Sequence, residues 1–303
     1  MQNLTPAHSR LAVSAAFAVV YVVWGSTYLA IRFAIETLPP FLMASARFLV
    51  AGSVLYVWAR LFAGAARPER AEWKTAAIVG TLLLLGGNGL VVWSELRIPS
   101  GVAALLGGTT PLWMVSIDWL RRGGAGPGFQ VILGLLCGLV GLAWLIGPDS
   151  LAGDGRIDLL GAAAVMLSAI TWATGSIYQR YAPTPASPSL ATATQMLCGG
   201  VALLAVAVAT GELQHVNVAA FSLRSVLGLL YLIVFGSIIA FSAYVWLLRA
   251  STPARVSTHT YVNPIVAVLL GWALADEPLT PRMLVAAAVI VVGVALITLA
   301  PRR

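Results

Sequence analysis

The sequence predicts an all-α membrane protein with ten transmembrane helices that form two inverted five-helix repeats. The first observation is composition: 59% of the 303 residues are hydrophobic and 10% are charged, whereas soluble domains carry about 25% charged residues. The second is the recurrence of apolar stretches close to the roughly 20 residues that a membrane-spanning helix needs. The third is a similarity between the two halves of the chain.

Each predicted span is an apolar stretch, and the connections are too short to form an extramembrane domain. In chain order the spans are 11–32, 41–60, 75–94, 100–119, 129–147, 158–179, 189–210, 223–248, 253–274 and 281–299. The first is longer than the apolar region of a signal peptide and lacks a small-residue cleavage site. We therefore expect it to remain in the membrane.

The basic residues are divided unequally between the two predicted sides of the membrane. With the N-terminus inside, five face outward, namely Arg32, Arg97, Arg156, Arg224 and Arg282. Twelve face inward, namely Arg10, Arg60, Arg67, Arg70, Lys74, Arg121, Arg122, Arg180, Arg249, Arg255, Arg302 and Arg303. The positive-inside rule predicts that both termini are cytoplasmic, and the protein is expected to be a multi-pass protein of a bacterial inner (cell) membrane. The net charge of +7 then reflects topology and attraction to anionic lipid, and no nucleic-acid partner is expected.

The chain is predicted to consist of two related halves, residues 1–149 and 150–303. At an offset of 148, Trp24 coincides with Trp172, Arg32 with Arg180, Pro40 with Pro188 and Gly52 with Gly200; at 153, Trp93 coincides with Trp246 and Pro111 with Pro264. Five spans are an odd number, so the second half must enter the membrane from the opposite side. Inverted repeats are typical of secondary transporters, with the substrate site near the midplane. The alternative is a duplicated scaffold that transports nothing.

Several motifs resemble one known family. They are WGSTYLAIRFAIETLPPFLMASARFLVAG, GNGLVVWSE, PSGVAALL, FGSIIAFSAYVWLL and YVNPIVAVLLGWALADEPLT, and they are similar to the EamA-type exporters of the drug/metabolite transporter (DMT) superfamily. The resemblance implies ten helices around a central cavity and export of small metabolites, often amino acids, as in the aromatic amino-acid exporters of the YddG kind. One departure is Ala275-Asp276-Glu277, where the family usually has a glycine and a single glutamate.

Aromatic side chains supply one set of predicted substrate-binding residues. Trp24 and Tyr28 share a helix face with Tyr21, and Trp24 lies near the middle of its span rather than in an interfacial belt. Such a face suits a cavity wall that stacks on a planar or apolar solute, although helix packing explains it as well. The predicted aromatic site residues are Trp24, Tyr28, Trp172, Tyr178 and Tyr244.

Polar residues within the spans supply the other predicted set, Asn88, Thr110, His259 and Asn263. Asn88 is flanked by glycines, and Thr110 and Asn263 each precede a proline that frees a backbone carbonyl. His259 lies one helical turn before Asn263, and an intramembrane ionisable residue indicates function by default; a neutral, hydrogen-bonded histidine is the alternative.

Arg47 is expected to have a structural role, paired with an acid near the outer face such as Glu36 or Glu95. The midplane is therefore expected to hold no cation. This argues against a nucleotide-sugar-like exchanger, which would need cavity Lys or Arg for phosphate.

Enzymatic function is not expected, because the chain lacks catalytic and P-loop motifs. Three histidines and two separated cysteines, Cys137 and Cys198, predict no metal site, and no cofactor is expected. The prediction is a secondary transporter, monomeric and surrounded by lipid, that exports small amphipathic metabolites by alternating access. Amino acids, aromatic ones included, are the expected substrates; a multidrug exporter of the same fold and a non-transporting scaffold are the alternatives.

Overall fold

The structure is a computed structural model that describes residues 9–98, 103, 106–121, 126–151, 158–275 and 280–301. All regular elements within these ranges are helical. The α-helices are α1 (Arg10–Ala34), α2 (Pro40–Val57), α3 (Arg70–Gly80), α4 (Leu90–Glu95), α6 (Thr110–Leu120), α7 (Phe129–Leu151), α8 (Leu159–Tyr181), α9 (Pro188–Ala209), α10 (Leu223–Tyr231), α11 (Ser242–Ala250), α12 (Pro253–Val256), α13 (His259–Ala275) and α14 (Pro281–Leu299). Three π-helical stretches, η1 (Trp58–Phe62), η2 (Thr81–Gly89) and η5 (Leu232–Phe241), and two 3₁₀ turns, η3 (Glu212–His215) and η4 (Val218–Ala220), join or extend them.

Seven helical segments of the described chain are long and apolar enough to cross a membrane. They are Arg10–Ile31, Pro40–Phe62, Arg70–Ser94, Leu159–Tyr181, Pro188–Ala209, Leu223–Ala250 and Pro281–Leu299. Phe129–Trp144 is a shorter apolar helix. The all-helical membrane architecture is confirmed, and the number of ten spans stays a prediction.

Two predicted spans differ from the observed helices. In the span 100–119, a turn at Gly108 and Thr109 separates the helical residues 106–107 from α6, so Pro111 lies in the first turn of α6. In the span 253–274, a turn at Ser257 and Thr258 separates α12 from α13. Pro264 does lie inside α13. The helical path is thus interrupted just before Pro111, and two matched proline kinks stay a prediction.

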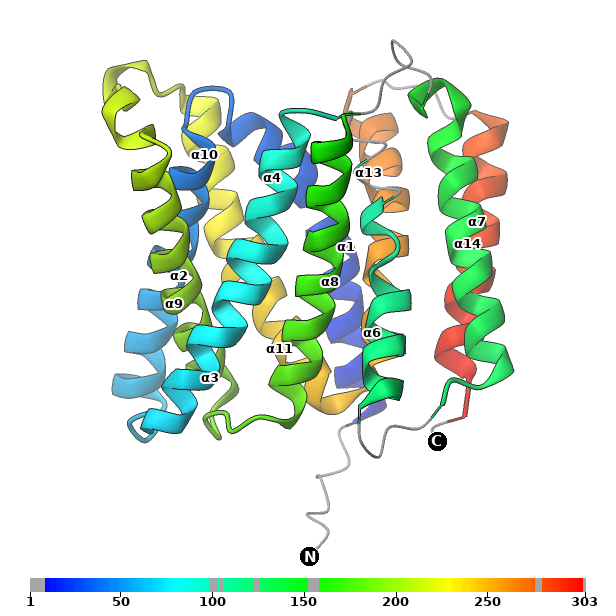
Figure 1. Cartoon of the computed structure of the whole chain (residues 1–303), viewed down its shortest axis with the longest axis horizontal. Helices are drawn as coiled ribbons and strands as arrows, with labels where there is room; N and C mark the ends of the chain where they lie inside the picture. The colour runs from blue at the N-terminus through cyan, green and yellow to red at the C-terminus, as the bar shows by residue number, and fades with distance from the viewer. Residues whose placement is uncertain are drawn as a thin grey trace, which may run out of the picture.

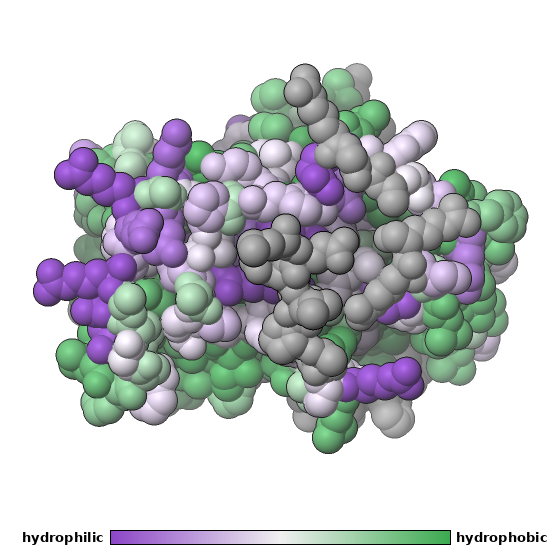
Figure 2. Space-filling model, turned by 90° about the horizontal axis from the view of Figure 1, so that it is seen from below, coloured by the Kyte–Doolittle hydropathy of each residue, from purple (hydrophilic) through white to green (hydrophobic). Residues whose placement is uncertain are grey.

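The long helices stand side by side in one bundle (Figure 1). The start of α1 and the end of α14 lie at the same end, the lower end in Figure 1, and we call the opposite end the upper end. Helix α1 rises through the bundle and α8 descends, which is the relation expected of inverted repeats. Seen from below, hydrophilic residues cover much of the lower end face, while hydrophobic residues dominate its rim (Figure 2).

Helices α2 and α9, and likewise α7 and α14, pack together along their lengths (Figure 1). These are matching elements of the two predicted halves. Glycines allow the close approach, as small residues do in bilayers: a Cβ on Gly134 of α7 would lie 2.7 Å from the carbonyl oxygen of Gly293 in α14. The two halves therefore make much of their contact through equivalent surfaces.

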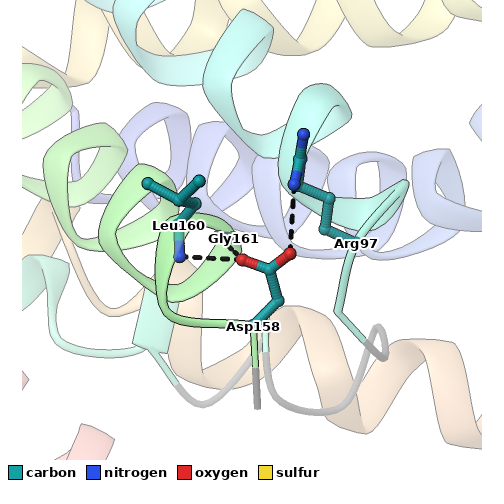
Figure 3. A network of polar contacts seen from close by, with 4 residues as sticks. All are labelled: Arg97, Asp158, Leu160 and Gly161. Atoms are coloured by element: carbon teal, nitrogen blue, oxygen red, sulfur yellow. Dashed lines mark hydrogen bonds and ion pairs between the residues drawn. The ribbon is translucent and has the colours of Figure 1, made fainter. Parts of the chain in front are cut away.

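A polar link at the upper end connects α4 with the start of α8 (Figure 3). Asp158 caps α8 by accepting hydrogen bonds from the backbone nitrogens of Leu160 at 2.8 Å and Gly161 at 3.0 Å. It also forms an ion pair of 3.1 Å with Arg97. The backbone hydrogen bond from Gly161 and the Arg97 side chain hold the pKa of Asp158 below its usual value.

Candidate substrate cavity

A cavity of about 160 Å³ lies inside the bundle and is bordered by both halves of the chain. Its walls come from α1, α2, η2, α4, the start of α6, α8, η5 and α13. Six of the nine predicted site residues line it, namely Trp24, Asn88, Thr110, Trp172, His259 and Asn263. These residues come from five separate helical elements, so the fold brings them together across long sequence distances.

Five rings form an aromatic cluster at one side of the cavity: Trp24, Trp172, Phe241, Tyr244 and His259. The ring of Trp24 lies 5.0 Å from Tyr244, 5.0 Å from His259 and 5.6 Å from Trp172, measured between centroids. The Trp24–Trp172 pair is edge-to-face, with planes at 77°, an arrangement that aromatic rings prefer. The two tryptophans that coincide in the repeat alignment thus meet in the structure.

Hydrogen bonds fix the orientation of both tryptophans. The indole nitrogen of Trp24 donates to the carbonyl oxygen of Gly236 at 3.1 Å, and that of Trp172 donates to the hydroxyl of Tyr244 at 2.8 Å. The same hydroxyl is 2.6 Å from Ser176 Oγ. Tyr244 is fully buried and does not line the cavity. Its place is behind Trp172, which it holds in position.

The two π-helical stretches that border the cavity offer backbone carbonyls to the other half of the chain. Gly236 of η5 accepts from Trp24, as described, and Gly87 of η2 accepts from Ser168 Oγ of α8 at 2.9 Å. Both η2 and η5 contain cavity-lining residues, and π-helical turns occur frequently at functional sites.

The polar residues that line the cavity differ in how well their side chains are hydrogen-bonded. Thr110 donates to the carbonyl of Gly107 at 2.6 Å, and Asn88 makes a long hydrogen bond of 3.4 Å to the carbonyl of Leu83. His259 Nδ1 lies 2.9 Å from the carbonyl of Val256, so Nδ1 carries the hydrogen in a neutral ring. Asn263 is 4% exposed, and its Oδ1 is buried without a hydrogen-bond partner in the described structure.

Arg47 also lines the cavity, contrary to the expectation that no cation lies there. It is 6% exposed. Its predicted partner Glu36 instead pairs with Arg224, at 3.5 Å. The side chain of Glu95 is outside the described structure. The prediction overlooked Arg47 because hydropathy places a residue in a span without telling which wall its side chain reaches.

Two other intramembrane tyrosines, Tyr178 and Tyr21, do not line the cavity, and the side chain of a third, Tyr28, is not described. Tyr178 is 37% exposed near the end of α8 and does not border the cavity; six residues separate it from Trp172, which places it on a different helix face. Tyr21 bonds to Thr258 Oγ1 at 2.5 Å. The side chain of Tyr28, like residues 276–279 with Asp276 and Glu277, is outside the described structure.

The cavity extends from the aromatic cluster toward the upper end. On α1 its lining residues are Trp24, Thr27 and Ile31, which follow the rising helix at intervals of three and four residues. On the lower side of Trp24, the bond between Tyr21 and Thr258 joins α1 to the turn before α13. The aromatic cluster therefore forms the floor of a space that lies on the side of the upper end.

A helical membrane bundle with a mixed aromatic and polar cavity between two matching halves is the architecture of a membrane carrier. The EamA-like transporter family profile matches this chain twice, over residues 11–147 and 159–299. The chain therefore belongs to the EamA-like transporter family.

Curated relatives agree with the family. The uncharacterized inner membrane transporter YedA of Escherichia coli (strain K12) is 38% identical over 281 residues, covering 92% of this chain and 88% of YedA. Protein PecM of Dickeya dadantii is 27% identical over 265 residues, covering 87% of this chain and 84% of PecM. A protein crystal structure that is 21% identical shares the fold, with a TM-score of 0.77 over 97% of this chain and all of that one. The resemblance to EamA-type transporters is confirmed, and it extends along nearly the whole chain.

Proposed function

We propose that this protein is a non-enzymatic secondary transporter that exports small amphipathic metabolites, amino acids in particular, by alternating access. The observation that carries the proposal is the cavity, which both halves of the chain build from aromatic rings and polar side chains. Trp24 and Trp172 offer faces for apolar parts of a solute. Asn88, Thr110, His259 and Asn263 offer polar contacts.

The cavity volume favours a small solute. About 160 Å³ is less than the roughly 300–1,000 Å³ of pockets for drug-sized ligands. A small amino acid suits this conformation. An aromatic amino acid requires the cavity to widen on binding, and a bulky drug requires far more, so the proposal favours a metabolite exporter over a multidrug exporter.

The experiment is counterflow in proteoliposomes with a panel of labelled amino acids that runs from L-alanine to L-tryptophan. We expect the protein to exchange at least one of them faster than protein-free liposomes do. Trp172→Ala removes a wall of the cavity and should slow exchange. Trp144→Ala is the matched control, because Trp144 is a tryptophan on α7 that is 54% exposed and lies outside the cavity. If no member of the panel is exchanged, amino acids are not the substrates.

A further inference from the structure

We propose that the guanidinium group of Arg47 binds the carboxylate of the transported solute, which makes small zwitterionic amino acids the substrate class. This inference rests on the proposed function, because it assigns a ligand group to one residue of the same cavity.

Arg47 is a buried cation without a protein anion among the described side chains. Among the described side chains, Arg97 pairs with Asp158, Arg121 with Asp118 and Arg224 with Glu36, whereas Arg47 has no carboxylate partner there. A charge buried in apolar surroundings is costly unless it is paired. Charged residues inside a membrane bundle face cavities and mark substrate pathways. Arg47 meets that description, since it lines the cavity and is 94% buried.

The protein holds this side chain in a fixed position without using up its donors. Nε donates to Ser237 Oγ at 2.7 Å, and the guanidinium carbon lies 4.7 Å from the centre of the Phe48 ring. Arginine has five N–H donors, so one hydrogen bond leaves the two terminal nitrogens for a ligand. Those two nitrogens form the planar fork that matches both oxygens of a carboxylate.

Gly236 leaves space for the guanidinium group. A Cβ at Gly236 would lie 2.8 Å from Nη2 of Arg47 and 3.1 Å from Cγ2 of Thr27. Any larger residue there would push the terminal nitrogens away. The carbonyl of the same glycine receives the indole hydrogen of Trp24, so the cation and the aromatic wall share one support.

Arg47 needs hydrogen-bond acceptors, whereas the side-chain oxygen of Asn263 needs a donor. The buried Oδ1 of Asn263 accepts no hydrogen bond from the described structure, and a buried acceptor without a donor is costly. The ammonium group of an amino acid carries three such donors. Arg47 and Asn263 line the same cavity from α2 and α13, and a zwitterion carries the one group that each of them lacks. A phosphate would bring further acceptor oxygens into a cavity where Asn263 Oδ1 already lacks a hydrogen-bond donor.

The test compares ligands that differ by one charged group. Counterflow uses labelled L-alanine or L-phenylalanine, whichever exchanges faster. The unlabelled competitors are the same amino acid, its decarboxylated amine (ethylamine or phenethylamine) and its deaminated acid (propionate or 3-phenylpropionate). The proteins are wild type, Arg47→Gln, Arg47→Lys and the control Arg224→Gln, which removes an exposed cation that already has a carboxylate partner.

We expect the amine to compete at least tenfold more weakly than the amino acid in wild type. Arg47→Gln should weaken competition by the amino acid by about 10- to 100-fold, the range for a lost charged hydrogen bond. The amine should be little affected, so the preference for the amino acid disappears. Arg47→Lys should retain part of the preference, and Arg224→Gln should retain all of it.

A structural role predicts a different pattern, in which Arg47→Gln weakens all competitors alike and the preference persists; that pattern overturns the inference. Amine and amino acid competing equally in wild type overturns it without any variant, which covers the case that Arg47→Gln does not fold. If wild type exchanges no amino acid, the proposed function fails. The thermal stability of wild type and Arg47→Gln is then measured with propionate and with inorganic phosphate, which tests whether Arg47 binds a carboxylate. Arg47-dependent stabilisation by propionate supports carboxylate binding, whereas stabilisation by phosphate alone or by neither contradicts it.

Discussion

Trp24 and Trp172 are equivalent in the repeat but differ in burial, and this difference predicts unequal effects of the same substitution. Trp24 is 9% exposed and contacts four rings of the cluster. Trp172 is only partly buried. We therefore expect Trp24→Ala to reduce mainly stability and Trp172→Ala to reduce mainly transport.

The magnitudes follow from burial. Replacing a buried large aromatic residue by alanine costs about 3–5 kcal/mol, and each tryptophan also loses a hydrogen bond worth about 0.6 kcal/mol in a membrane protein. We assign Trp24→Ala about 4.5 kcal/mol and Trp172→Ala about half of that. An unfolding entropy of about 2.1 cal/mol/K per residue converts these losses into Tm decreases of roughly 7 °C and 3–4 °C.

The assay combines thermal unfolding of purified protein with counterflow normalised to folded protein. Trp172→Ala should show the larger loss of transport per folded molecule, and Trp24→Ala the larger loss of Tm. Trp144→Ala should change neither. Equal Tm decreases in the two variants, or an unchanged Tm in Trp24→Ala, would refute the reasoning that burial separates the two roles.

Three further predictions concern topology, packing and pH. A reporter fused after Arg303 should be active in the cytoplasm, and periplasmic activity would reverse the predicted orientation. Gly134→Ala should lower stability by about 1–3 kcal/mol, because the new Cβ meets the backbone of α14. Gly107→Ala should not, since no described atom beyond its chain neighbours lies within 4 Å of a Cβ there. Thermal unfolding measures both. The depressed pKa of Asp158 means that its stabilisation is complete above the unfolded pKa of about 3.9 and disappears as pH falls through the lower folded value. Wild type should therefore melt above Asp158→Asn at pH 6, and the two melting temperatures should converge as the pH falls below about 4.

Much of the fold could be predicted because a bilayer constrains the sequence strongly. A spanning helix must be long and apolar, so hydropathy located the observed helices to within a few residues in most spans. The repeat offset paired Trp24 with Trp172, and their rings do meet, at 5.6 Å between centroids.

The cavity wall was harder to predict, because side-chain direction depends on which neighbours pack against each helix. Tyr178 and Tyr244 looked alike as intramembrane tyrosines, yet one is exposed and the other lies behind Trp172. Arg47 was expected to pair with an acid near the outer face, but in the tertiary structure Glu36 pairs with Arg224. The π-helical turns of η2 and η5 also change the helical period, so regular spacing could not assign their faces.

The reciprocal hydrogen bonds from Trp24 to η5 and from Ser168 to η2 have a mechanical consequence. Each half of the chain donates a hydrogen bond to a backbone carbonyl of the other, so the two bonds link the halves in both directions. Bonds of this kind contribute about 0.6 kcal/mol each, close to thermal energy. Such links are strong enough to help keep the halves in register and weak enough to yield at ordinary temperature, which suits the alternating access proposed above.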